Sequence, residues 1–155
     1  MIPKLAALAL ALAVAAGTTS YARAATDPTA AVKADLAKLV SDYASARDTI
    51  VADVQQVTSA AQSAKGGSKA DAKAAIRAQL QKLRPDLRAA HTTLRADRKQ
   101  LHIDLKAARQ AGVAKSLRPD IVSALKSLRQ DRHDVRAAIK SALQAIRDLR
   151  KSFHS

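Results

Sequence analysis

The sequence predicts an all-α protein, an up-down-up antiparallel three-helix bundle or coiled coil of long helices. Apolar residues recur in steps of three, four and seven, the spacing of helices that each carry one apolar stripe. The chain is rich in alanine, aromatic residues make up only 2% of it, and cysteine is absent, so neither a thick core nor a disulfide framework can form. A helical unit also occurs twice with a period of 34 residues.

Residues 1–24 have the features of a secretory signal peptide. Lys4 gives a positive start, a short apolar run follows it, and Ala-Arg-Ala at 22–24 places small residues where a signal peptidase cleaves. We expect cleavage after Ala24 and an exported protein, periplasmic or secreted, with one helical domain at residues 25–155. No later apolar run approaches the roughly 20 residues that a membrane-spanning helix needs, so we expect no transmembrane segment in the mature chain.

The first helix is expected at about residues 29–64, with Asp27 or Thr29 as its N-cap. Its apolar positions form one stripe. Gly66 and Gly67 follow it and favour a left-handed chain reversal, which starts the next helix in the opposite direction.

The second helix is expected at about residues 69–111. Ser68 and Asp71 have the spacing of a capping box at its start, and Gly112 marks its end. Pro85 removes one backbone donor and clashes with the preceding turn. Because the apolar stripe continues through Pro85 without a change of phase, we expect one continuous helix that is kinked there.

The third helix is expected at about residues 116–153, with Ser116 as its N-cap. The segment 83–109 recurs at 117–143 with 11 identities in 27 positions, and both copies begin with Leu-Arg-Pro-Asp. In the second copy, Pro119 falls in the first turn, where the backbone donors are unpaired anyway. The repeat therefore predicts two versions of one helical unit.

The net positive charge of the mature chain lies in the second and third helices. Residues 25–64 contain three basic residues against five aspartates, a net charge of −2. Residues 65–155 contain 22 basic residues against eight aspartates, a net charge of +14.

On these two helices, basic residues follow the apolar seam positions and aspartates precede them, so each stripe has a basic edge and an acidic edge. The basic residues that we expect to bind anions are Arg77, Arg84, Arg88, Arg95, Lys99, Lys106, Arg109, Arg129, Arg136, Lys140 and Arg147. One interpretation is that both edges are solvated flanks that set helix pairing, as in coiled coils. The other is that the basic edges form a rail for a polyanion.

The relative facing of the second and third helices decides between two arrangements of these edges. If their basic edges are adjacent, they form a long cationic surface. The opposite handedness would set the acidic edge of the first helix against the basic edge of the third and neutralise part of it. Both remain open from the sequence.

Arg98 and Arg132, and to a lesser degree Arg47, occupy seam positions where leucine is expected. A buried unpaired guanidinium is costly, so each must pair with an aspartate of a neighbouring helix, extend outward, or face an interface. We interpret them first as polar residues that set the register.

The sequence offers little for catalysis, metals or cofactors. The four histidines, His91, His102, His133 and His154, form no i, i+4 pair with another metal-binding residue, and there is no cysteine nucleophile. We therefore expect no enzyme activity, no metal and no cofactor. Sequence-specific nucleic-acid binding is also disfavoured, because aromatic residues for base stacking are nearly absent.

We therefore expect an exported non-enzymatic protein whose basic helix edges bind an anionic envelope partner: an anionic polymer, a lipid surface or an acidic protein. One alternative is a periplasmic chaperone-like or stress protein that holds unfolded clients. Another is a structural coiled coil that self-associates into a homo-oligomer.

Overall fold

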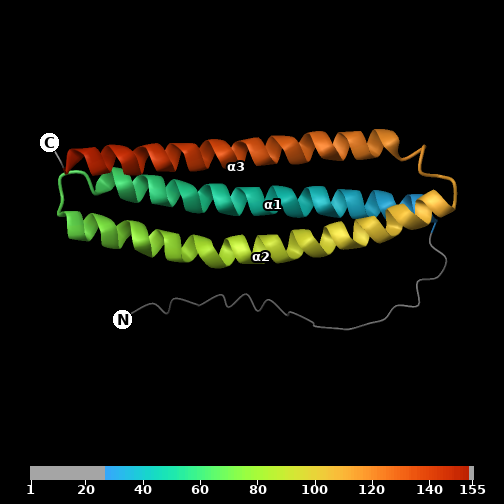
Figure 1. The fold of residues 1–155 in the computed structure, drawn as a ribbon, viewed down its shortest axis with the longest axis horizontal. Helices are drawn as coiled ribbons and strands as arrows, with labels where there is room; N and C mark the ends of the chain where they lie inside the picture. Colours follow the sequence, from blue (N-terminus) through green and yellow to red (C-terminus); the bar gives the residue numbers. More distant parts are fainter. Residues whose placement is uncertain (1–26, 154–155) are drawn as a thin grey trace, which may run out of the picture.

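The computed structural model describes residues 27–153, and the expected signal peptide at residues 1–24 lies outside this range. The described part consists of three long helices, α1 at Pro28–Ser63, α2 at Lys69–Gln110 and α3 at Arg118–Ser152, and contains no strand (Figure 1). Each helix begins and ends within two residues of its expected range. The predicted all-α, up-down-up fold is confirmed.

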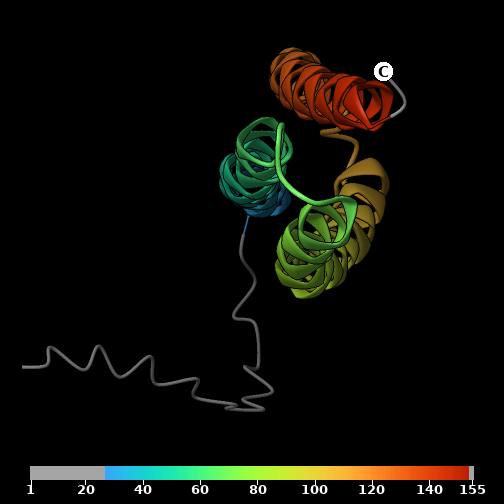
Figure 2. The ribbon, with the colours of Figure 1, turned by 90° about the vertical axis from the view of Figure 1, so that its left-hand side faces the viewer.

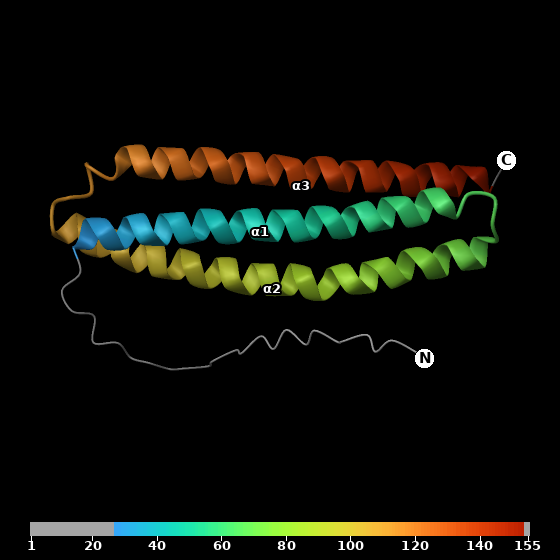
Figure 3. The same ribbon diagram turned by 180° about the vertical axis from the view of Figure 1, so that it is seen from behind.

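α1 is the central helix of the bundle. Consecutive helices run antiparallel, so α1 and α3 point in the same direction (Figures 1 and 3). α1 packs along its length against both α2 and α3, whereas no Cα atom of α2 lies within 8 Å of a Cα atom of α3. The view down the helices shows α1 on one side and α2 and α3 on the other (Figure 2). The bundle thus has two close seams and one wider one.

The core is a thin line of small clusters between the three helices. All three helices contribute to each cluster, and much of the contact is made by alanine. From one end to the other, the clusters are built around Leu36 with Ala108 and Ala124, Val54 with Ala142, and Ala61 with Ala72 and Leu149. Small side chains at these positions let α1 approach both neighbours closely, which is why the long helices can pack with almost no aromatic residues.

The helix ends follow the expected capping chemistry in two of three cases. Asp27 accepts a hydrogen bond from the backbone N–H of Thr29 (2.9 Å). Ser68 Oγ accepts one from the backbone N–H of Asp71 (3.1 Å). The glycines with left-handed backbone in the two reversals are Gly66 (φ 87°) and Gly112 (φ 74°).

The prediction that Ser116 caps α3 is wrong. Ser116 instead donates its hydroxyl to the carbonyl of Val113 (2.7 Å), within a series of turns that delays the helix to Arg118. Leu117 occupies the N-cap position and is fully buried in the first core cluster. Burial of this leucine, rather than a side-chain cap, fixes where α3 begins.

α2 continues as one helix through Pro85, as expected. It is bowed along its length rather than straight (Figures 1 and 3). Such bending accommodates the proline ring and the missing backbone hydrogen bond.

Candidate anion-binding face

The ion pairs between helices all involve α1. Each of its three basic residues pairs with an aspartate of a flanking helix, and no other ion pair joins two helices in the described part of the chain. The pairs are Lys33–Asp120 (3.5 Å), Lys38–Asp97 and Arg47–Asp131. The three basic residues of α1 thus all form ion pairs with aspartates of α2 or α3.

Three aspartates of α2 and α3 are buried, among them the partners of Lys38 and Arg47. Asp97 is 7% exposed, and Asp104 and Asp131 are each 5% exposed. Hydrogen bonds to Asp42 (2.6 Å) and to Asp97 raise the pKa of Lys38. The same ammonium group lowers the pKa of Asp42. The α1–α2 seam therefore contains a buried carboxylate, Asp97, whose counter-charge on Lys38 stays in contact with solvent, with 58% of the Lys38 side chain exposed.

The two arginines that were assigned to the seams are exposed, and the structure buries the residue before each of them, Asp97 and Asp131. Arg98 extends over the ring of Tyr43, with its guanidinium carbon 5.8 Å from the ring centroid, and donates a hydrogen bond to the tyrosine hydroxyl (3.3 Å). Of the alternatives open for these positions, outward extension applies to Arg98 and Arg132, and pairing with a neighbouring aspartate applies to Arg47.

The acidic edges of α1 and α2 face each other. Burial and a hydrogen bond with the Asp86 carboxyl raise the pKa of Asp53, while the charge of Lys82 opposes that rise. Two neighbouring carboxylates repel each other, so ionisation of both is unfavourable and the pair can share one proton. In this orientation of α2, its labelled bases Arg77 and Arg84 lie on the side away from α1.

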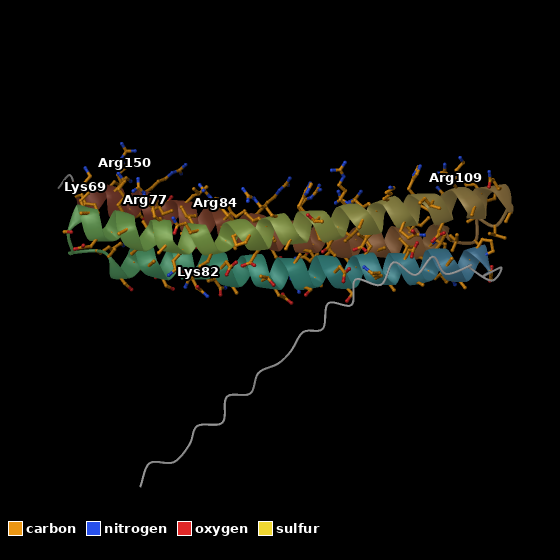
Figure 4. The ribbon with its side chains drawn as sticks, turned by 90° about the horizontal axis from the view of Figure 1, so that it is seen from below. Lys69, Arg77, Lys82, Arg84, Arg109 and Arg150 are labelled. Carbon is orange, nitrogen blue, oxygen red and sulfur yellow. The ribbon has the colours of Figure 1, made fainter. Side chains whose placement is uncertain are left out.

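The eleven expected anion-binding residues are all exposed, and none is in an ion pair with another described residue. Figure 4 shows nitrogen-tipped side chains of α2 and α3, among them Arg77, Arg84 and Arg150, projecting on the side opposite α1. Lys82 projects instead toward the α1 side. We call the surface formed by the eleven side chains the basic face.

The bases labelled on α2 and on α3 thus border the same side of the bundle. The helices do not meet there in close backbone contact, so the edges lie apart rather than packed together.

Sequence reasoning missed a second feature of α2 and α3. Among the described residues, the exposed large apolar ones all belong to α2 and α3. They are Leu80, Leu87, Ile103, Val122, Leu125, Ile139 and Leu143, with 39–51% of their surface exposed. For those that border the wide α2–α3 seam, the exposure arises because neither helix covers the stripe of the other.

The hollows on the described surface are open. One, of about 730 Å³, runs along α3 and is lined by its last turns together with Thr58 and Gln62 of α1. His91, His102 and His133 are exposed and separate, while His154 lies outside the described residues. No group of three or more metal-binding side chains occurs in residues 27–153.

No described helix has an apolar run long enough to cross a lipid bilayer. No protein-family model, curated protein or solved structure matches this chain.

Proposed function

We propose that this is an exported, non-enzymatic helical protein that binds an anionic partner of the cell envelope through the basic face. The observation that supports it is the difference between two groups of basic residues. The three basic residues of α1 form ion pairs with aspartates, whereas the eleven basic residues of the basic face are exposed and form no ion pair with a described residue. Export to the envelope rests on the signal peptide expected at residues 1–24.

The mechanism is electrostatic attraction along an extended surface. Guanidinium groups of arginine bind phosphate and carboxylate groups in a bidentate manner, and eight of the eleven residues are arginine. Charges that line one side of a rod attract a long anion at many points, so the association is fast and sensitive to salt. Phosphorylated glycolipids, wall polymers, anionic membranes and acidic polypeptides all have the required charge.

The test uses heparin, a generic polyanion, immobilised on a column and eluted with a salt gradient. The face variant combines Arg88→Gln, Arg95→Gln and Arg136→Gln. A control variant removes the same charge elsewhere, through Lys65→Gln, Lys82→Gln and Lys115→Gln, all of which are exposed and outside the basic face.

We expect the parent to elute late, the face variant to elute at clearly lower salt, and the control to remain close to the parent. Equal shifts for the two variants would mean that net charge alone attracts heparin, and the basic face would lose its role. Arg→Lys changes at the same three positions separate charge from guanidinium geometry, because only the bidentate contacts are lost.

A second candidate function is supported by the exposed apolar residues of α2 and α3. A periplasmic chaperone-like protein would hold unfolded clients on such a surface. Suppression of client aggregation that persists at high salt would favour it, because screening weakens charge attraction but not apolar contact. Self-association as a structural coiled coil is a weaker alternative, since two copies would bring their basic faces together; sedimentation over a range of concentrations tests it.

A further inference from the structure

We infer that the side of the bundle between α2 and α3 docks an acidic amphipathic helix of a partner protein, which lies lengthwise opposite α1. This inference rests on the proposed function and names its partner class. Two observations carry it: rows of exposed apolar residues that face the wide α2–α3 seam, and basic rows that lie outside them.

On α2, the apolar row is Leu80, Leu87 and Leu101, placed at multiples of seven residues so that they share one face. Leu101 packs against the core cluster to which Leu36 of α1 and Ala124 of α3 both belong, so this row borders the core between the helices. Leu80 and Leu87 continue it in the exposed part, at 39% and 43% exposure.

On α3, Ile139 and Ile146 are seven residues apart. Ile146 packs against the cluster that contains Ala72 of α2 and against the cluster on which Leu83 of α2 also packs, so this row borders the core that α3 shares with α2. Ile139 is 42% exposed and Leu143, on the adjacent turn, is 50% exposed. Each helix therefore presents unburied apolar surface to the same strip.

Labelled bases of both helices lie on the side of the bundle opposite α1. Arg77 and Arg84 on α2 and Arg150 on α3 project away from α1 in Figure 4. An apolar centre with a charged rim is the usual composition of a protein interface. The partner that matches it has an apolar stripe between two acidic edges, which is the pattern of an amphipathic helix.

The shape of the site also favours a helix. α2 and α3 contain 42 and 35 residues, which correspond to about 50–60 Å at 1.5 Å per residue. A straight rod can follow both rows over that length, and it would complete a four-helix arrangement with α1 on the opposite side. A flat membrane is a poorer match, because α2 and α3 contain no Trp, Tyr or Phe, the aromatic anchors typical of interfacial helices. A second copy of this chain would oppose like charges.

The test measures fluorescence anisotropy of a labelled synthetic peptide of about four heptads, with leucine at the a and d positions and glutamate at e and g. It is used at concentrations where the peptide alone is monomeric. A second peptide of the same composition has its residues reordered so that no stripe forms. The docking variant is Leu87→Ser with Ile139→Ser. Its matched control is Ile103→Ser with Val122→Ser, which removes equally exposed apolar residues on the same two helices but outside the rows.

We expect the parent to bind the striped peptide about tenfold more tightly than the reordered one, and the docking variant to lose about that factor, while the control variant retains it. All three proteins should elute alike from heparin, because their charges are unchanged. Circular dichroism and urea unfolding show whether each variant is folded.

Equal binding of the two peptides, or equal losses in the two serine variants, would overturn the docking inference and leave polyanion binding intact. Vesicles of phosphatidylglycerol and phosphatidylcholine are tested in parallel. Vesicle binding that depends on Leu87 and Ile139 without any peptide preference would reassign this side to a membrane surface. A face variant with unchanged heparin elution would instead refute the proposed function itself.

Discussion

The ion pair between Arg47 and Asp131 makes the clearest prediction about stability. The Asp131 side chain is 6% exposed and that of Arg47 is 28% exposed. Arg47→Met removes the cation and keeps most of the packing, so a buried carboxylate is left without its partner. Breaking buried pairs in this way costs about 3–5 kcal/mol. Because water reaches part of the arginine, we expect a loss of about 2–4 kcal/mol in the free energy of unfolding.

The reverse change should be less harmful. Asp131→Asn leaves Arg47 partly solvated and still paired with Asp48 at 2.8 Å, so the remaining charge is not isolated. We expect a loss of about 1–2 kcal/mol, close to that of one hydrogen bond to a charged group. Replacing both residues, with Arg47→Met and Asp131→Leu, should return stability to within about 1 kcal/mol of the parent, because no buried charge remains.

The assay is urea unfolding followed by far-ultraviolet circular dichroism, since the protein has no tryptophan. Lys33→Met is the control, because the Lys33–Asp120 pair has side chains 56% and 42% exposed and should contribute less than about 1 kcal/mol. If Arg47→Met costs no more than Lys33→Met, or if Asp131→Asn proves the more destabilising of the two single changes, the assignment of Asp131 as a buried charge held by Arg47 is wrong.

Three further changes test other parts of the fold by the same unfolding measurement. Pro85→Ala should stabilise the protein by about 1–3 kcal/mol, because a proline inside a helix is unfavourable by about 3 kcal/mol relative to alanine; no gain would mean that the bow of α2 is required for packing. Gly112→Ala should cost about 1 kcal/mol, because φ is 74° although a Cβ would meet no neighbouring atom, and a neutral result would contradict this. The pKa of Asp53 is raised above its ordinary value of 3.8. The protonated form of Asp53 therefore stabilises the fold below pH 3.8, and this stabilisation is lost as the pH rises through the raised pKa of the folded state. Asp53→Asn should therefore be more stable than the parent at neutral pH, with the difference disappearing in acid; a difference independent of pH would refute this.

The fold could be predicted because its determinants are local. Apolar spacing, the Asp27 and Ser68 caps and the glycine reversals act within a few residues of the positions they control. The start of α3 was missed for the opposite reason. Ser116 has the right side chain for a cap, but the burial of Leu117 against residues of α1 and α2 determines the conformation there, and that contact is not visible in the local sequence.

The candidate face was predictable residue by residue but not as a surface. Spacing along one helix placed the bases on a common edge, and each remained exposed. It could not show which edge turns toward α1, because a rotation of one residue exchanges Arg98 with Asp97 at the seam. The structure resolves that choice by pairing Asp97 with Lys38, so the sparse bases of α1, rather than the leucine pattern, fix the rotation of α2. The exposed leucines follow from the same orientation.

The repeated tetrapeptide Leu-Arg-Pro-Asp shows why duplication of sequence did not give duplication of structure. In both copies the leucine contacts the core: Leu83 packs against the middle cluster and Leu117 lies in the first. The prolines differ, since Pro85 lies inside α2 whereas Pro119 lies in the first turn of α3. What precedes each copy decides this. Helix-forming residues precede Leu83, whereas Gly112 ends the helix shortly before Leu117. A leucine anchored in the core is therefore compatible with either a helix interior or a helix start, and the upstream glycine selects between them.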